Sequence, residues 1–313
     1  MDSTRLGDHR RVTLTVNRTA LLVLVAAACA NPNSRESAQT GDNSTMSNRK
    51  GAVKSVHYSR SFGPFGSELA QFNRGGRSVV HLSHNYDRQP EIGHWNGSVT
   101  DAHFDELVRR LRASHYNEIE VPRLQYPGEY SLSIGEHREG EDRPMFKSCS
   151  LDAPELEPVL EWITQLTAEV RQRPVRVLRG QASWGAPEVR FEGPFDVRVT
   201  LENIGVEPFR LTHPGDPEQT MPAATLFFNN EDGAQRGFLE MGARRVIDAL
   251  PPATASDVVL APGERLTFTA RGVVPVEADQ YWGSLVLRAS GDHSDASALS
   301  GQLTLELGPV IVR

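Results

Sequence analysis

The chain has 313 residues, of which 38% are apolar and 23% are charged, so it has enough apolar material for one or two globular domains. The 33 basic and 40 acidic side chains give a formal charge of −7, and this balance offers no electrostatic footprint for nucleic acid. Two Cys are too few for a disulfide framework or for a zinc module built on four cysteines.

The first 28 residues have the pattern of an export signal. A segment with four Arg and two Asp, residues 1–18, is followed by the apolar stretch ALLVLVAAA at 20–28 and then by Cys29. A basic start, a short apolar stretch and small residues before a cleavage point are typical of a secretory signal peptide. The apolar stretch is too short for a stable membrane-spanning helix. We therefore predict a signal peptide over residues 1–28.

Cys29 indicates a more specific type of export signal. The segment Val25-Ala26-Ala27-Ala28-Cys29 resembles the lipobox of bacterial lipoproteins, with Ala26 where Leu is usual. The resemblance implies that Cys29 is acylated and becomes the first residue of the mature protein, anchored in a membrane. Ala30 follows, and the absence of Asp there resembles lipoproteins sorted to the outer membrane. The alternative is an ordinary cleaved signal in which Cys29 has no role.

A polar segment separates the anchor from the body. Residues 30–52 are rich in Ser, Asn and Thr and offer almost nothing to bury, so we expect residues 29–52 to form a lipidated Cys and a disordered tether. A flexible linker of this length reaches roughly 25–30 Å. The tether would hold a folded body just clear of a membrane surface.

Residues 53–180 show the pattern of an α+β domain. Four segments with strand character, broken by Gly-rich turns, precede a helix whose apolar stripe is Phe104, Leu107, Val108 and Leu111. Thr100 or Asp101 is placed to cap that helix. Two further strands and a second helix follow, and the second helix is predicted to open at Asp152. The order favours an antiparallel sheet with two helices.

The same region resembles the emfourin family, small bacterial proteins of which some inhibit thermolysin-type metalloproteases. The family reads Ser-Gly-Gly-Phe-x-Gly near its start. Here Ser61, Gly63, Phe65 and Gly66 fit that pattern, whereas Phe62 and Pro64 differ from it. The resemblance covers residues 53–170 and implies a partner-binding segment at Ser61, Phe62, Gly63, Phe65 and Gly66. The alternative for this segment is a turn that only connects two strands.

Residues 181–313 are predicted to form an all-β sandwich. Short strand candidates recur every ~8–14 residues, separated by turns, and alternation is clear at Phe195, Val197, Val199 and Leu201. The phrases VRVTLENIGVEPFRL and VLAPGERLTF resemble immunoglobulin-like bacterial domains, including the BsuPI type, a group that also has protease-inhibitor members. The expected fold is an α+β domain followed by an immunoglobulin-like sandwich.

The sequence shows no catalytic constellation, and we expect neither a cofactor nor a metal. His81 and His84 would point to opposite faces of one strand, with His94 and His103 further along the chain. Ser133 and Ser148 lie within predicted strands, and no Gly-x-Ser-x-Gly elbow is present. Cys149, within FKSCSL, reads as a buried thiol; a hydrolase that uses it as nucleophile is the remaining enzymatic alternative.

These observations favour a non-enzymatic, membrane-anchored envelope lipoprotein that binds another protein. The expected partners are a membrane, through lipid on Cys29, and an envelope or extracellular protein, with no nucleic acid. Because both halves resemble families with inhibitor members, a protease inhibitor of thermolysin-type or subtilisin-type enzymes is the alternative.

Overall fold

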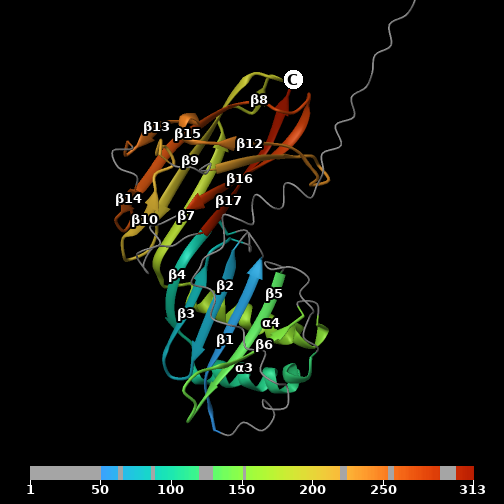
Figure 1. Ribbon diagram of the computed structural model, residues 1–313, viewed down its shortest axis with the longest axis vertical. Helices are drawn as coiled ribbons and strands as arrows, with labels where there is room; N and C mark the ends of the chain where they lie inside the picture. The colour runs from blue at the N-terminus through green and yellow to red at the C-terminus, as the bar shows by residue number, and fades with distance from the viewer. Residues whose placement is uncertain are drawn as a thin grey trace, which may run out of the picture. The chain divides into compact units, whose positions relative to one another are not determined.

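The computed structural model describes residues 51–62, 66–85, 89–119, 130–150, 153–218, 224–252, 257–289 and 301–313 (Figure 1). All of these residues belong to one compact unit, 38–313. Within the described part of the chain, no helix is long and apolar enough to cross a membrane. The signal peptide, Cys29 and the tether up to residue 50 lie outside the described residues, so their predictions remain predictions.

The first part of the unit contains six strands and two α-helices, at the positions that the sequence pattern indicates. They are β1 (Val53–Phe62), β2 (Ser67–Asn73), β3 (Arg77–Leu82), β4 (Glu91–Ser98), α3 (Asp101–Ala113), β5 (Tyr130–Arg138), β6 (Met145–Cys149) and α4 (Glu157–Val170). Short 3-10 turns occupy Tyr116–Glu118 and Pro154–Leu156.

The two helices begin differently. Thr100 caps α3, where its Oγ1 accepts a hydrogen bond from the His103 backbone N–H at 3.2 Å, as expected of a threonine at this position. Helix α4 begins at Glu157, so the predicted start at Asp152 is wrong, and Asp152 itself lies outside the described residues. No side chain caps α4, and Pro158 stands in its first turn, where a proline needs no hydrogen-bond partner for its nitrogen.

The remainder of the unit is built from strands. They are β7 (Pro174–Trp184), β8 (Glu188–Val189), β9 (Pro194–Asn203), β10 (Phe209–Thr212), β11 (Ala224–Asn229), β12 (Gln235–Met241), β13 (Val246–Leu250), β14 (Asp257–Leu260), β15 (Arg265–Val273), β16 (Asp279–Ala289) and β17 (Gly301–Val312). With two α-helices among the described residues, the protein is mostly β. Neither β7 nor β13, which pairs irregularly with β15, was among the predicted strands.

One sheet runs through both parts. Its ten strands are ordered β13-β15-β9-β7-β4-β3-β2-β1-β5-β6, beside a five-stranded sheet β12-β11-β16-β17-β8 and a two-stranded pair β10-β14. Strand β7 pairs with β4 on one side and with β9 on the other, and residue 180, where the sequence suggested a division, lies within β7.

The sheet changes its covered face at β7. The neighbours Val177 and Leu178 are 0% and 1% exposed and belong to two different hydrophobic cores. The first core lies between the sheet and helices α3 and α4, and the second packs the opposite face of the sheet against the five-stranded sheet. Gly180 makes this second contact possible, because a Cβ there would lie 2.5 Å from Leu303 Cδ2. The face of the sheet that packs against the five-stranded sheet in the second part is therefore the same face that carries no helix in the first part.

Polar contacts fix the end of β3 to β17. The Asn85 side chain donates to Thr304 O at 2.6 Å and accepts from Thr304 N at 2.6 Å, as a paired strand residue would. His84 forms an isolated bridge with Gln302, and its Nδ1 lies 3.2 Å from Gln302 O.

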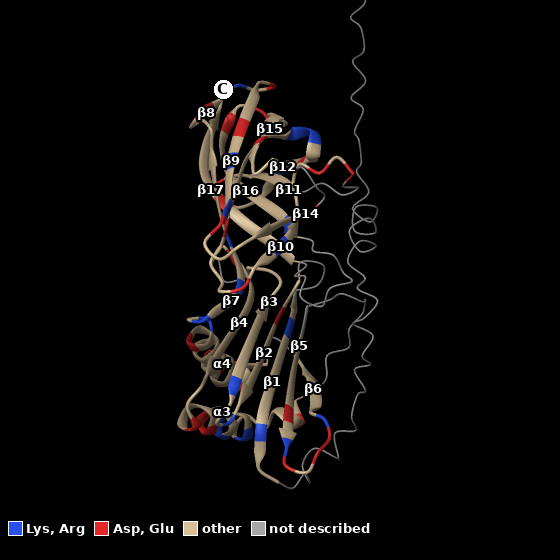
Figure 2. Ribbon diagram, turned by 90° about the vertical axis from the view of Figure 1, so that its left-hand side faces the viewer, with Lys and Arg blue, Asp and Glu red and all other residues tan. Residues whose placement is uncertain are grey.

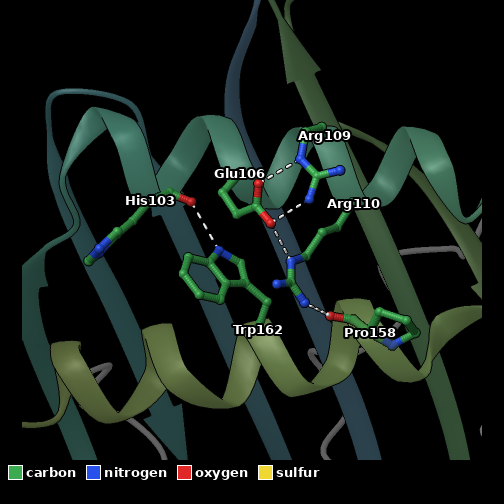
Figure 3. Close-up of polar contacts among 6 residues, drawn as sticks. All are labelled: His103, Glu106, Arg109, Arg110, Pro158 and Trp162. Atoms are coloured by element: carbon green, nitrogen blue, oxygen red, sulfur yellow. Dashed lines mark hydrogen bonds and ion pairs between the residues drawn. The ribbon is translucent and has the colours of Figure 1, made fainter.

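A second set of polar contacts joins the two helices (Figure 3). Trp162 of α4 donates from Nε1 to His103 O of α3 at 3.0 Å. Arg110 lies over the Trp162 ring at 4.9 Å and donates to Pro158 O at 2.8 Å. Glu106 binds Arg109 through two hydrogen bonds and Arg110 through one, and these bonds lower the pKa of the Glu106 carboxyl to about 2. The contacts are confined to α3 and α4, so we assign them to helix packing.

Candidate partner-binding face

One face of the helical part of the sheet carries no helix. Side chains alternate along each strand, and the register places Val56 and Tyr58 of β1 beside Phe72 and Ala70 of β2, in the core beneath α3 and α4. The intervening residues point away from the helices, which lie behind the sheet in Figure 1. We call this surface the open face. It comprises His57, Ser59, Ser61, Leu69, Gln71, Val79, His81, His94, Asn96, Ser133, Phe146 and Ser148.

The twelve residues of the open face carry no formal charge, but positive charge borders them: Arg77 continues the same face of β3, and Arg176 of β7 lies opposite His94. None of its twelve residues is Lys, Arg, Asp or Glu. Burial lowers the pKa of His57, His81 and His94, so these imidazoles are neutral at pH 7. The charged residues of this part lie mainly on α3, α4 and the strand ends, as Figure 2 shows.

Two large apolar side chains are exposed on this face. Phe146 is 46% exposed and Leu69 is 43% exposed. Phe146 lies over Gly135, where a Cβ would come within 2.7 Å of the phenyl ring, and its ring meets His57 edge-on at 5.8 Å. Because Gly135 has no side chain, the Phe146 ring packs directly against the backbone of β5. Ser133 and Ser148 beside it, with hydroxyl oxygens 3.4 Å apart, are small and leave the ring standing above the surface.

His81 and His94 form a cross-strand pair on β3 and β4, at the side of the open face nearest β7. They are directly opposite each other on β3 and β4, with ring centroids 6.3 Å apart. Burial and, to a smaller extent, the nearby His94 together lower the pKa of His81 to about 4. Among the described residues no group of three metal-ligating side chains occurs, and a zinc site needs three or four protein ligands.

The other two histidines considered as metal ligands lie elsewhere. His84 follows the end of β3 and contacts β17, so the expectation that it shares a strand with His81 is wrong. His103 lies on α3, where its Nδ1 is 3.0 Å from Glu169 Oε2. The structure therefore brings together His81 and His94 and leaves His84 and His103 apart from them.

The predicted partner-binding segment closes the β1–β2 hairpin at the rim of the open face. Ser61 pairs with Ser67, and Phe62 pairs with Tyr130 across β5. Gly63 and Phe65 lie outside the described residues, as does the side chain of Phe62. Gly66 has φ +129°, and a Cβ there would lie 2.7 Å from Ser83 Oγ, so this position requires glycine.

Ser83 anchors the base of this hairpin. Its Oγ accepts from Ser67 N at 2.7 Å and donates to Ser67 O at 3.1 Å, and its backbone N–H donates to Ser67 O at 2.9 Å. Ser83, which directly follows β3, thereby holds the base of the β1–β2 hairpin through its side chain as well as through its backbone.

Cys149 is fully buried beneath the sheet. Its burial raises the pKa of the thiol to about 11, against a smaller opposite effect of Lys147. A nucleophilic cysteine needs the reverse shift, towards thiolate at neutral pH. The expectation of a buried thiol is confirmed, and the structure gives no support to a hydrolase that uses this residue.

Sequence reasoning missed Leu69, Phe146 and His57 as surface residues. The available signal was the alternation within single strands. In VHYSRSF, the positions that alternate with Val56 and Tyr58 are His57, Ser59 and Ser61, and all three side chains are uncharged. Their gathering on one face depends on the lateral order β6-β5-β1-β2-β3-β4, which no single strand encodes.

Comparisons with known proteins give weak matches. No protein-family description matches the sequence, and no curated protein matches it. Among solved structures, the CARDB domain of a Pyrococcus furiosus protein in complex with di-metal ions is 12% identical, with a TM-score of 0.24, and covers 45% of this chain and 91% of that chain. The C-terminal domain of wzt is 10% identical, with a TM-score of 0.26, and covers 43% of this chain and 71% of that one. A PapD-like domain of human CEP192 is 10% identical, with a TM-score of 0.20, and covers 42% and 87%. All of these TM-scores are below 0.5, so the description of the fold rests on the strand pairing given above.

Proposed function

We propose that this chain is an exported, lipid-anchored envelope protein that binds another protein through the open face. The observation that carries the proposal is the exposure of two apolar side chains, Phe146 and Leu69, on a face whose twelve residues carry no charge and whose β3–β4 edge is bordered by Arg77 and Arg176. The centres of protein–protein interfaces are depleted in charge and enriched in aromatic residues. An exposed phenyl ring that is already held in place by packing against its own sheet loses little conformational freedom when a partner covers it.

The size of the face suggests a transient complex. Six strands spaced ~4.8 Å apart span about 24 Å, and the alternating positions extend about 17–20 Å along the strands. The resulting area of roughly 400–500 Å² is smaller than the ~800 Å² per partner of a stable interface. We therefore expect affinity in the micromolar range, unless the hairpin between β1 and β2 adds contacts.

Site-specific photo-crosslinking tests this proposal in cells. A photoreactive phenylalanine analogue is placed at Phe146 and, as a matched control, at Phe238 of β12, which is 44% exposed. We expect a discrete adduct from position 146 that is absent from position 238. Once the partner is identified and purified, Phe146→Ala and Leu69→Ala should each weaken binding about tenfold or more, and Phe238→Ala should leave it unchanged. Equal adducts from both positions, or equal affinities, would contradict the proposal.

Protease inhibition is the second candidate. The observation that favours it is the anchored base of the β1–β2 hairpin, because an inhibitory loop must keep its conformation when a protease binds it. Titration of the full chain against a thermolysin-type and a subtilisin-type protease should then give tight, saturable inhibition. Gly66→Ala should weaken this inhibition, because the new Cβ displaces the Ser83 anchor. Undiminished activity of both proteases, in the presence of folded protein, would oppose this candidate and leave the open-face proposal standing.

The lipid anchor is tested separately. Metabolic labelling with a palmitate analogue should modify the wild-type chain and fail to modify Cys29→Ser, and only the wild type should sediment with outer membranes. Labelling of the Cys29→Ser variant would exclude Cys29 as the lipidated residue.

A further inference from the structure

A pocket of about 700 Å³ lies where β3 begins and β4 ends, next to the open face. Its walls come from the β2–β3 turn, the end of β4, the link between α4 and β7, and the loop that follows β9. The polar side chains that line it are Arg77, Asn96, Ser98, Gln172 and Arg173. The backbone N–H of Asn96 donates to Arg173 O at 3.2 Å, which joins two of the walls.

Two arginines of this pocket have no carboxylate partner among the described residues. Their neighbours do: Arg74 pairs with Asp105, and Arg176 pairs with Glu207 at 2.7 Å. Arg77 and Arg173 therefore contribute positive charge to the lining of the pocket. Asp101, at the start of α3, is the acidic group that borders the β2–β3 turn at Gly75. The pocket therefore keeps a net positive charge.

The positive charge of Arg77 in this pocket, together with that of Arg176 outside its lining, acts on His94 of the open face. Burial lowers the pKa of His94, and the charges of Arg176 and Arg77 lower it further, while Glu207 acts in the opposite sense. His94 is separated from the pocket residue Asn96 by one position of β4, on the same face. It is therefore a built-in reporter of charge in the pocket, since a bound anion would raise its pKa.

We propose that this pocket binds a phosphate or sulfate group carried by a small ligand. Guanidinium groups bind tetrahedral oxyanions through paired, charge-assisted hydrogen bonds. Two arginines on opposite walls, with the amides of Asn96 and Gln172 and the hydroxyl of Ser98, supply more donors than the two oxygens of a carboxylate accept. Val175 and Val206, which is 72% exposed, give the ligand's organic part an apolar border.

The proposal does not depend on the protein-binding function. It is tested on the full chain by calorimetric titration with inorganic phosphate, sulfate and acetate at constant ionic strength. We expect phosphate and sulfate to bind with dissociation constants on the order of 0.1–1 mM and acetate to bind more weakly. In parallel, NMR titration of the His94 imidazole should show a higher pKa when phosphate saturates the pocket.

Charge variants locate the site. Arg77→Gln and Arg173→Gln should each weaken phosphate binding about tenfold. Arg210→Gln is the matched control, because Arg210 is exposed on β10, away from the pocket lining. If phosphate binds no better than acetate, if all three variants lose affinity equally, or if the His94 pKa does not rise, the proposal is overturned. The last readout uses unaltered protein, so it does not depend on whether a variant folds.

The source of the phosphate is decided by competition. Vesicles of phosphatidylglycerol and of phosphatidylcholine are compared for binding, with free glycerol phosphate as competitor. Binding to phosphatidylglycerol vesicles that glycerol phosphate displaces would indicate a lipid headgroup as ligand. Binding of glycerol phosphate without binding to either vesicle would indicate a soluble phosphoester. Absence of both would overturn the proposal.

Discussion

His81 should make the stability of this protein sensitive to mild acid. Its pKa falls from an ordinary value of 6.5 to about 4, mainly because the folded sheet buries the imidazole. The unfolded chain therefore binds a proton more readily than the folded one between these two values. The stability contributed by neutral His81 is present above pH 6.5 and is lost as the pH falls towards 4.

The size of the effect follows from proton linkage. With pKa values of 6.5 and about 4, the free energy of unfolding should decrease by about 2 kcal/mol between pH 7 and pH 5 on account of His81 alone. His57 and His94 shift in the same direction and add to the acid sensitivity of the wild type. The variant His81→Asn removes only the first contribution.

Urea unfolding of wild type and His81→Asn at pH 7, 6 and 5 measures this difference. The stability gap between the two proteins should shift by about 2 kcal/mol in favour of the variant as the pH falls. His115→Asn, at a side chain that is 72% exposed, is the control and should follow the wild type. If the NMR titration of His81 has its midpoint near 6.5, or if all three proteins lose stability in parallel, the assignment of His81 as a buried, neutral imidazole is refuted.

Three further predictions concern packing. Iodoacetamide at pH 8 should leave Cys149 unlabelled in the native protein and label it in denaturant, because burial raises its pKa to about 11; mass spectrometry of the Cys149 peptide reads this out, and native labelling would contradict the burial. Gly93→Ala should cost about 2–4 kcal/mol in urea unfolding, since φ is +151° and the Cβ would lie 2.3 Å from Arg176 O, whereas Gly140→Ala, with φ +82° and open space, should cost about 1 kcal/mol. Trp162→Phe removes the hydrogen bond to His103 O and should cost about 1–2 kcal/mol in the same assay; an unchanged unfolding midpoint would show that this bond contributes nothing.

Local structure was readable from the sequence where one periodicity dominates. The stripe through Phe104 and Leu111 and the cap at Thr100 located α3, and the alternation from Phe195 to Leu201 located β9. The start of α4 was misplaced because a proline-rich first turn favours a 3-10 turn, which the capping pattern does not reveal. Strand β13 was missed because its irregular pairing, with Asp248 at φ 50°, breaks the alternation.

The candidate sites depend on relations between strands, which the sequence does not carry. His81 and His94 were both noted as histidines, but their pairing follows from the register of β3 with β4. Likewise Arg77 and Arg173 are 96 positions apart (173 minus 77) and line one pocket only because the link after α4 runs beside the end of β4. The open face was unpredictable for the same reason.

The change of covered face at β7 has a consequence for the way the protein unfolds. Val177 and Leu178 are adjacent in one strand and anchor two different cores, so amide exchange with solvent in this strand requires both cores to open. A chain cut at residue 180 would lose the second half of β7 and expose Ile92 and Leu178, which are 0% and 1% exposed in the intact protein. We therefore expect the two halves to unfold as one cooperative unit, and proteolysis within β7 to inactivate both together.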